Sequence, residues 1–225
     1  MSTSTTNSEK ETPVQHLLRS LQITATSRFF AAKRFRSHES WSLWAISFAS
    51  LLLIFIPLFK PFGLSIYLLD GLVNVAQVLS AAIILVFSLL VNGSKYGERA
   101  EMMHSCALAI NSLSRKLEKQ IYAGTAEEAH SVLSCEYENL LEKHENHSDQ
   151  DFLFAQIRKF PTYYNVTWKK IAMAYLQKSL SFAPYMLLVL IQCGFIWLML
   201  VNPQNDPILR VLGIARYSVS DQIDE

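Results

Sequence analysis

The sequence predicts an all-α membrane protein, and three observations support this fold class. Residues 41–59 and residues 72–91 form apolar runs of nineteen and twenty residues without a charge, and a third apolar run covers residues 182–201. Because a bilayer core about 30 Å thick requires roughly 20 residues of helix, each run is long enough to span it. The polar sequence between the second and third runs has helical periodicity and no clear strand pattern.

The first two runs are predicted to form a transmembrane hairpin over residues 41–91. The residues between its spans include Lys60, Pro61 and Gly63, which suit a turn at a membrane surface. The remaining segments are, in order, a disordered N-terminus (1–12), a juxtamembrane amphipathic helix (13–40), a cytoplasmic helical domain (92–181), a third transmembrane helix (182–201) and a C-terminal tail (202–225).

Composition excludes several classes of protein. The formal net charge of +1 provides no overall field that would attract nucleic acid, so we expect no direct nucleic-acid binding. Three cysteines, Cys106, Cys135 and Cys193, cannot all pair within the chain, which favours free thiols in a reducing compartment. The first forty residues are polar and basic, so we expect no secretory signal.

The distribution of Lys and Arg near the spans predicts the orientation of the chain. It predicts a multi-pass membrane protein, with the N-terminus and residues 92–181 in the cytoplasm and the hairpin loop and C-terminus outside. Nine basic residues fall on the predicted inner side and three on the outer side. The inner group is Arg28, Lys33, Arg34, Arg36, Lys95, Arg99, Lys169, Lys170 and Lys178, and the outer group is Lys60, Arg210 and Arg216.

The segment before the first span admits two interpretations. Apolar residues recur in it at steps of three and four residues, which predicts an amphipathic helix. Its basic group, Arg28, Lys33, Arg34 and Arg36, could lie on an anionic membrane surface. Alternatively, the helix packs against the other cytoplasmic helices, which we favour because the apolar period extends upstream of the basic group.

One side of the second span is polar. At about 100° per residue, Asn74, Gln77, Ala81, Ser88 and Asn92 share one side of the helix, and Gln192 adds a carboxamide near the middle of the third span. Carboxamides in hydrocarbon are costly unless they find partners, so this side should meet protein or water. It either packs against other helices or lines a pore built from several copies.

Within residues 92–181 the apolar spacing predicts several helices. One runs through residues 103–121 and ends at Gly124, and Thr125 with Glu128 predicts a capping box for the next. A third covers Phe152–Phe160 and stops at Pro161, and a fourth begins near Tyr164 and could continue into the third span.

The segment between the second and third of these helices contains histidines and carboxylates. His144, His147, Asp149 and Asp151 could form a metal site. The simpler interpretation, which we favour, is that a helix ends near Glu145 and that Ser148 or Asp149 caps the next one, so we expect no metal.

Motifs for catalysis are lacking. The sequence has no phosphate-binding Gly-rich loop, no Gly-x-Ser-x-Gly elbow and no Cys-x-x-Cys pair. Cys106 or Cys135 with a histidine partner is the remaining enzymatic alternative, but a cysteine on an apolar helical stripe is typical of a core. We therefore expect no enzymatic activity and no cofactor.

Two segments resemble those of a known family. The segment Ser27-Arg-Phe-Phe-Ala-Ala-Lys-Arg-Phe-Arg36 leads into the hairpin, and Tyr137-Glu-Asn-Leu-Leu-Glu-Lys-His-Glu-Asn-His-Ser-Asp-Gln-Asp-Phe152 follows it. Over roughly residues 18–160 the chain is similar to the SLATT family, the SMODS and SLOG-associating two-transmembrane effectors. These accompany bacterial nucleotide-synthesising and nucleotide-sensing defence proteins. The chain most resembles the branch found beside reverse transcriptases, and its third span departs from the two-span pattern.

The resemblance implies a membrane effector of a prokaryotic anti-phage system that forms a pore or otherwise disrupts the inner membrane and so arrests or kills the cell. It implies the lipid bilayer and further copies of the chain as partners. The trigger would be a nucleotide signal, or a reverse transcriptase or nucleotide-sensor protein. The alternative function is a non-conducting membrane anchor that recruits a cytoplasmic enzyme. A transporter subunit is a weaker alternative, because the sequence has neither an inverted repeat nor a broken span.

Overall fold

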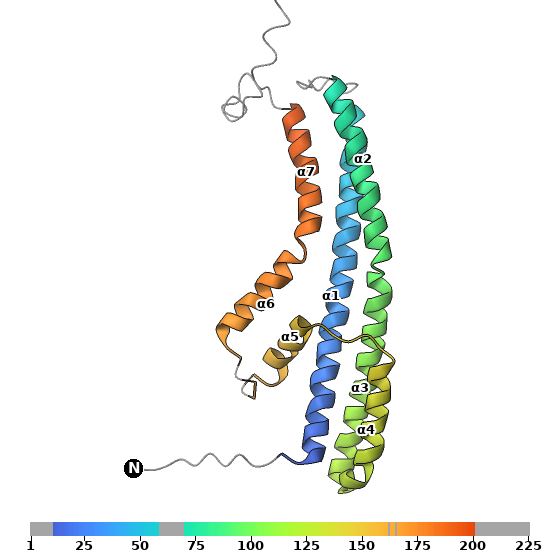
Figure 1. Cartoon of the computed structure of the whole chain (residues 1–225), viewed down its shortest axis with the longest axis vertical. Coiled ribbons are helices and arrows are strands. Elements are labelled where there is room, and N and C mark those ends of the chain that lie inside the picture. Colours follow the sequence, from blue (N-terminus) through green and yellow to red (C-terminus); the bar gives the residue numbers. More distant parts are fainter. Residues whose placement is uncertain (1–10, 59–69, 162, 165, 201–225) are drawn as a thin grey trace, which may run out of the picture. The chain divides into compact units, whose positions relative to one another are not determined.

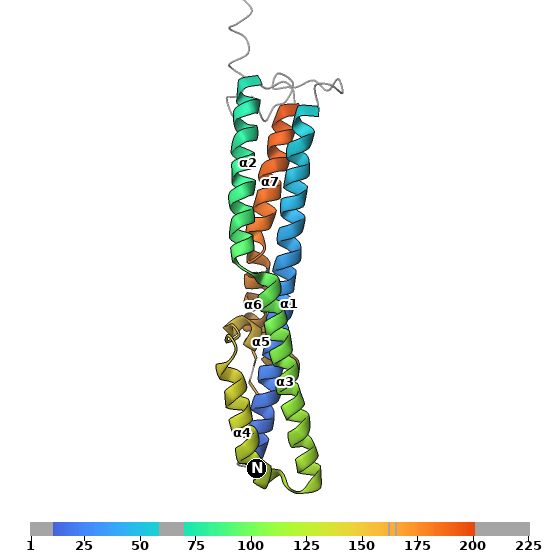
Figure 2. The ribbon, with the colours of Figure 1, turned by 90° about the vertical axis from the view of Figure 1, so that its right-hand side faces the viewer.

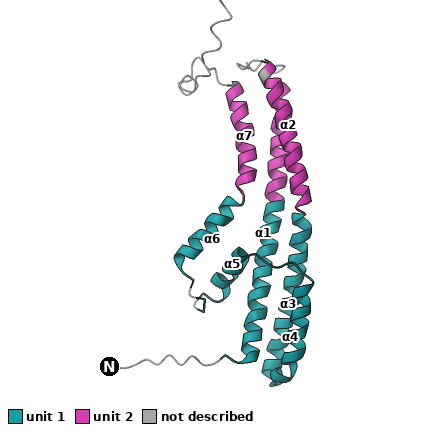
Figure 3. Cartoon of the chain, in the orientation of Figure 1, with its two compact units in different colours: residues 1–39, 95–181 teal, residues 40–94, 182–225 magenta. Residues whose placement is uncertain are grey.

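The computed structural model of the chain describes residues 11–58, 70–161, 163–164 and 166–200, and all regular secondary structure in these residues is helical (Figure 1). The chain divides into two compact units (Figure 3). The polar unit comprises Met1–Glu39 and Lys95–Ser181, and the spanning unit comprises Ser40–Ser94 and Phe182–Glu225. Two helices are long and apolar enough to cross a membrane, and a bent helix pair supplies a third candidate, so the predicted fold class is confirmed.

Seven α-helices and one 3₁₀ turn make up the described part of the chain. They are α1 (Pro13–Phe55), η1 (Ile56–Leu58), α2 (Asp70–Gly93), α3 (Tyr96–Ala123), α4 (Ala126–Glu142), α5 (Asp149–Lys159), α6 (Trp168–Leu180) and α7 (Ala183–Leu200). The predicted hairpin turn up to residue 69, residues 1–10 and residues 202–225 lie outside the described residues.

The predicted juxtamembrane helix and first span are one uninterrupted helix. α1 runs through the boundary between the two units because no glycine or proline interrupts the sequence between Val14 and Ile56. It ends at Phe55, two residues before Pro57, which lies in η1. Proline lacks the backbone N–H that a continuing α-helix would need, and it disfavours helical conformation in the residue before it.

The core of the polar unit lies where α1, α3 and α4 pack together, and Figure 2 shows α4 beside α1 and α3. Its buried residues are Val14, Leu17, Leu21 and Ala25 from α1, Cys106, Ile110, Leu113 and Leu117 from α3, and Leu133 from α4. A second cluster places Ala31, Ala32 and Phe35 of α1 against Ala100 and Met103 of α3. Of the two interpretations of residues 13–40, packing against other helices is therefore the one that this structure contains.

The connection between α3 and α4 confirms one predicted signal and contradicts another. Gly124 ends α3 in the left-handed conformation at φ 74°, as predicted, and the next N–H, that of Thr125, bonds to the Gln120 carbonyl at 3.0 Å. The predicted capping box of Thr125 and Glu128 is wrong, because the Thr125 hydroxyl donates to the Gln120 side chain instead. Only two residues separate the helices, and Thr125 has ψ of 15°, not the extended backbone from which a side chain reaches the next turn.

In the spanning unit, α7 packs with α2 and with the part of α1 from Ser40 onward. One buried cluster joins Ala45 and Ala49 of α1, Ile84 of α2, and Tyr185 and Leu188 of α7. Many other large apolar side chains remain exposed, as expected for helices in a bilayer. Among them are Leu51, Ile54, Leu85, Leu90, Leu187 and Leu190.

The predicted continuation of the helix before the third span into that span is wrong. α6 ends at Leu180 and α7 begins at Ala183. Pro184 accounts for the break, because its nitrogen cannot donate to the Leu180 carbonyl as an uninterrupted helix would require. Early in α7, where helical N–H groups have no partner in their own helix, the same proline is tolerated.

Replacing Ile110 with alanine should destabilise the polar unit. Ile110 is fully buried between α1 and α4, so Ile110→Ala should cost about 2–5 kcal/mol by leaving a cavity. Hydrogen exchange of α3 in the full chain in nanodiscs measures this loss. The control, Leu108→Ala on the same helix, removes a side chain that is 51% exposed and should change exchange little. Equal effects of the two substitutions would contradict the packing.

Candidate functional sites in the two units

Two arginines of α1 hold the turn between α4 and α5 within the polar unit. Arg28 donates from Nη1 to the Glu145 carbonyl oxygen at 2.9 Å. Arg34 donates from Nε and Nη2 to the two carboxylate oxygens of Asp151, at 3.1 and 2.8 Å. The second contact is a bidentate, charge-assisted pair, which is stronger and more directional than a neutral hydrogen bond. We call Arg28, Arg34, Glu145, Ser148 and Asp151 the arginine junction.

Asp151 also closes the N-terminus of α5. The Ser148 hydroxyl accepts from the Asp151 N–H at 3.3 Å, and the Ser148 N–H donates to the Asp151 carboxylate at 3.3 Å, which forms a capping box. The predicted capping by Ser148 is therefore confirmed. The alternative metal site is not assembled, since no group of three or more His, Cys, Asp or Glu in the described part of the chain could hold an ion.

Arg28 is a buried cation, 1% exposed, and no carboxylate among the described residues forms a salt bridge with it. Burial raises the pKa of the Cys106 thiol, with Arg28 opposing the shift, and burial likewise raises the pKa of Tyr137. Cys106 is thus a buried thiol held in its protonated form, which does not support the enzymatic alternative.

The four residues of the predicted basic surface divide into two groups. Lys33 and Arg36 are exposed, and Nη2 of Arg36 lies 3.6 Å from Oε2 of Glu101. Arg28 is buried and Arg34 is half-buried on Asp151, so these two are engaged inside the polar unit and not on a surface. A signal for this was present in the sequence. Arg28 stands three residues after Ala25, four before Ala32 and seven before Phe35, and so continues the buried stripe of α1.

In the spanning unit, the predicted polar side of α2 borders the side that packs against the other helices. Asn74, Ala81 and Asn92 are exposed, whereas Gln77 and Ser88 are half-buried; we call these five residues the polar strip. The buried side next to it contains Val73, Ser80 and Ile84, and Ser80 is a polar residue that the sequence analysis did not single out. The strip is therefore available to another chain or to water, and no hydrogen bond joins Asn74 to any described residue.

Gln192 lies inside the spanning unit on α7. Its side chain is 1% exposed, and neither Oε1 nor Nε2 has a hydrogen-bond partner among the described residues. Within the described residues, therefore, Gln192 forms no hydrogen bond to another span. A buried carboxamide without partners is costly.

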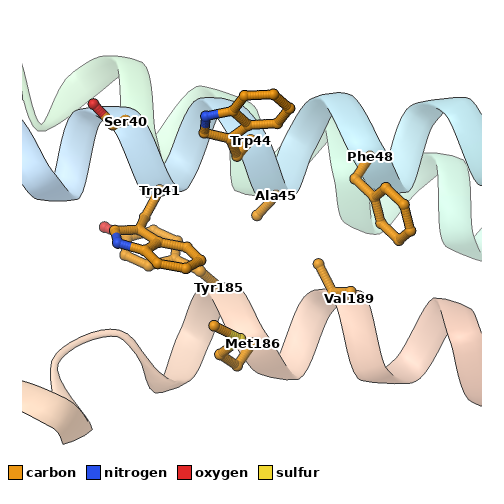
Figure 4. Close-up of a pocket in the computed structure, with 8 residues that line it drawn as sticks. All are labelled: Ser40, Trp41, Trp44, Ala45, Phe48, Tyr185, Met186 and Val189. Atoms are coloured by element: carbon orange, nitrogen blue, oxygen red, sulfur yellow. The ribbon is translucent and has the colours of Figure 1, made fainter.

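A groove of about 580 Å³ lies between α1 and α7 in the spanning unit (Figure 4). Figure 4 shows the side chains of Trp41 and Tyr185 next to one another at one end and Val189 pointing towards α1. The groove is lined by Ser40, Trp41, Trp44, Ala45, Phe48, Tyr185, Met186 and Val189. Since none of these is charged and most are apolar, the groove suits hydrocarbon and not a polar substrate.

These features together define an all-α membrane protein with a separately packed polar unit. The chain belongs to the family described as SMODS and SLOG-associating 2TM effector domain family 5, whose model matches residues 10–200. The resemblance to the SLATT family is thereby confirmed. The match includes α6 and α7, which lie beyond the two spans that the description names. No curated protein and no solved structure matches the chain.

Neutralising Asp151 should loosen the arginine junction. Asp151→Asn leaves the half-buried Arg34 without its counter-charge, which should cost about 3–5 kcal/mol. Hydrogen exchange across residues 143–160 in the full chain measures this. The control, Glu136→Gln, breaks the exposed pair with Lys116 and should cost less than about 1 kcal/mol. Similar effects of the two substitutions would show that the Arg34–Asp151 pair stabilises the polar unit no more than an exposed ion pair does.

Acidification should weaken the same region through His147. Burial lowers the pKa of His147 below its ordinary value of 6.5, and Arg28 lowers it further, while Asp151 and Asp149 oppose the shift. The folded state thus favours the neutral imidazole. Its stabilising contribution is complete above the unfolded value and is lost as pH falls through the lowered folded value.

Exchange of residues 144–152, corrected for intrinsic rates, should therefore rise between about pH 7.5 and about pH 5.5. His147→Gln should remove much of this dependence in that segment. Retention of the full pH dependence in His147→Gln would assign it to another group.

Proposed function

We propose that this protein is a membrane effector of a prokaryotic anti-phage system, which assembles from several copies and permeabilises the inner membrane when triggered. The observation that carries the proposal is the polar strip of α2, whose Asn74 and Asn92 are exposed and whose Gln77 and Ser88 are half-buried along a helix of membrane length. Membership of an effector-domain family whose description names two transmembrane spans supports it.

The polar strip argues for assembly. A carboxamide such as Asn74 at membrane depth needs a partner, and hydrogen bonds between spanning helices are worth about 1–2 kcal/mol in model peptides. In the described residues the chain offers two candidate spanning helices, or three if the bent pair of α6 and α7 is counted as one span, too few to enclose a water-filled channel. Several copies would place their strips together, where the carboxamides meet one another in a closed state and water in an open one.

The interior of the spanning unit supports a second state. Gln192 and Ser80 are buried polar residues, and the carboxamide of Gln192, which has no partner among the described residues, costs on the order of 1–3 kcal/mol. A rearrangement that brings Gln192 to water or to another chain would recover this energy. The closed conformation would then lie close in free energy to an open one, and a trigger needs only to bind the two states differently.

The orientation follows from the basic residues. Lys33 and Arg36 are exposed in the part of α1 that precedes the first span, which supports an orientation with the N-terminus and the polar unit on the cytoplasmic side. There the polar unit could receive a nucleotide signal, or a reverse transcriptase or nucleotide-sensor protein. The uninterrupted α1 continues from the polar unit into the first span and supplies a covalent route for the signal.

A non-conducting scaffold is the alternative function. Tyr122, near the C-terminal end of α3, is 93% exposed, and Val132 on α4 is 66% exposed, which offers apolar contacts to a cytoplasmic partner enzyme. Expression with a potential-sensitive dye separates the two functions, because the effector depolarises the inner membrane and the scaffold does not.

Removing the carboxamides of the polar strip should abolish ion leakage. In Asn74→Leu with Gln77→Leu, two polar groups are lost while the helix becomes more apolar, so the protein should still insert but should no longer depolarise cells or release dye from liposomes. The control, Val86→Leu, alters the exposed apolar side of α2 and should leave leakage unchanged. Undiminished leakage from the double variant would show that the polar strip does not line the conducting pathway.

A further inference from the structure

A cavity of about 350 Å³ lies in the polar unit between α1, α3 and α5. It is separate from the groove of the spanning unit and falls within the range of about 300–1,000 Å³ that small-molecule sites occupy. Its walls combine aromatic, carboxamide and basic side chains. They are Gln22, Ala25, Thr26, Phe29, Phe30 and Lys33 of α1, Asn111 of α3, and Arg158 and Lys159 of α5.

The cavity has an excess of positive charge. Lys33, Arg158 and Lys159 all line it, no lining residue is acidic, and none of the three cations forms a salt bridge with a described carboxylate. Other cations of the polar unit, such as Arg34, do have such a partner. The position of Arg158 and Lys159 in the last turn of α5 suits the helix dipole, but it does not account for Lys33 of another helix lining the same cavity.

The remaining lining groups suit a planar ring. Phe29 and Phe30 are half-buried, and Arg158 lies above the Phe30 ring with its guanidinium carbon 6.0 Å from the ring centroid. Aromatic rings and guanidinium planes are the groups on which nucleobases stack. Asn111 forms no side-chain hydrogen bond with a described residue. Gln22 donates to Glu118 at 3.1 Å, which leaves its carbonyl oxygen free to accept.

We propose that this cavity binds a nucleotide, with the base held by Phe29 and Phe30 and the phosphates by Lys33, Arg158 and Lys159. Phosphate oxyanions accept charge-assisted hydrogen bonds from lysine and arginine, and a carboxamide offers both a donor and an acceptor to a base edge. The inference rests on the proposed function only in treating the ligand as the trigger, since binding itself requires no pore.

The position of the cavity explains how occupancy would reach the rest of the polar unit. A bound ligand would contact α1 and α3 near their common core and the C-terminal end of α5, whose N-terminal end is held to α1 through Asp151 and Arg34. Phe30 also contacts Phe154 of α5 at a centroid distance of 5.8 Å. A bound nucleotide would therefore hold the C-terminal end of α5 to α1, in addition to the contact that already holds its N-terminal end.

Binding is tested by calorimetry on the full chain in nanodiscs of neutral lipid, with ATP, GTP, adenosine and inorganic tripolyphosphate as probes. ATP or GTP should bind, and adenosine and tripolyphosphate should each bind more weakly, because each lacks one half of the recognised groups. Lys33→Gln with Arg158→Gln should weaken binding by about tenfold or more. The control, Arg115→Gln with Lys119→Gln, removes two exposed cations of α3 that do not line the cavity and should have no effect.

Several outcomes would overturn the proposal. Equal affinity for tripolyphosphate and the nucleotides would reduce the site to an anion site, and competition by phosphatidylglycerol in the bilayer would assign it to a lipid headgroup. Equal losses in the cavity and control variants, or no binding of any probe, would also contradict it. Unchanged exchange of α3 in the cavity variant shows that it remains folded. Calorimetry measures binding and not leakage. A failure of nucleotide binding would therefore not contradict the proposed pore, which the leakage assay tests separately.

Discussion

Polar groups that a helix carries into an apolar environment must find partners, and the two units meet this constraint differently. In the polar unit, Arg28 and Arg34 lie on or beside the buried stripe of α1, and both donate to groups of the same chain, although Nε of Arg28 has no partner among the described residues. The Glu145 carbonyl belongs to the segment before α5, and the Asp151 carboxylate belongs to the first helical turn of α5. These hydrogen bonds partly offset the cost of burying Arg28 and half-burying Arg34, and they fix the position of α5.

In the spanning unit, two carboxamides have no such partner among the described residues. Gln192 is enclosed without a hydrogen bond to any described residue, and Asn74 is exposed along a helix that is apolar enough to cross a membrane. Water can satisfy such groups on a soluble protein, but lipid tails cannot. The proposed assembly of several copies rests on that difference. A second copy or a water-filled path would provide what the single chain lacks, and a change between the two would give a closed and an open state.

Local signals in the sequence determined much of the helical map. Pro57 and Gly124 mark where α1 and α3 end, and Ser148 caps α5, because each acts through the backbone of its own segment. The periodicity also placed the polar residues of α2 on one side of the helix. The capping box predicted at Thr125 is wrong because the short connection between α3 and α4, and not the Thr125 side chain, sets the backbone conformation of this residue.

Interactions between distant segments could not be predicted in this way. Arg28 and Glu145, like Arg34 and Asp151, are separated by 117 residues, so nothing near either arginine in the sequence indicated its partner. The same holds for the nucleotide cavity, to which three helices contribute. Residues 27–36 and 137–152 were recognised separately by their resemblance to the family. Their contact in the arginine junction gives a physical reason for the two segments to occur together.

The surroundings of Asn74 in the membrane-bound protein test the central claim most directly. A spin label at Asn74→Cys, in a chain whose three native cysteines are replaced by serine, reports its accessibility to oxygen, which concentrates in lipid, and to a water-soluble nickel complex. Leu79→Cys, on the apolar side of α2 where the native side chain is 58% exposed, supplies the lipid-facing reference. The account predicts much lower oxygen accessibility at position 74 than at position 79. Equal oxygen accessibility at the two positions, with and without trigger, would contradict it.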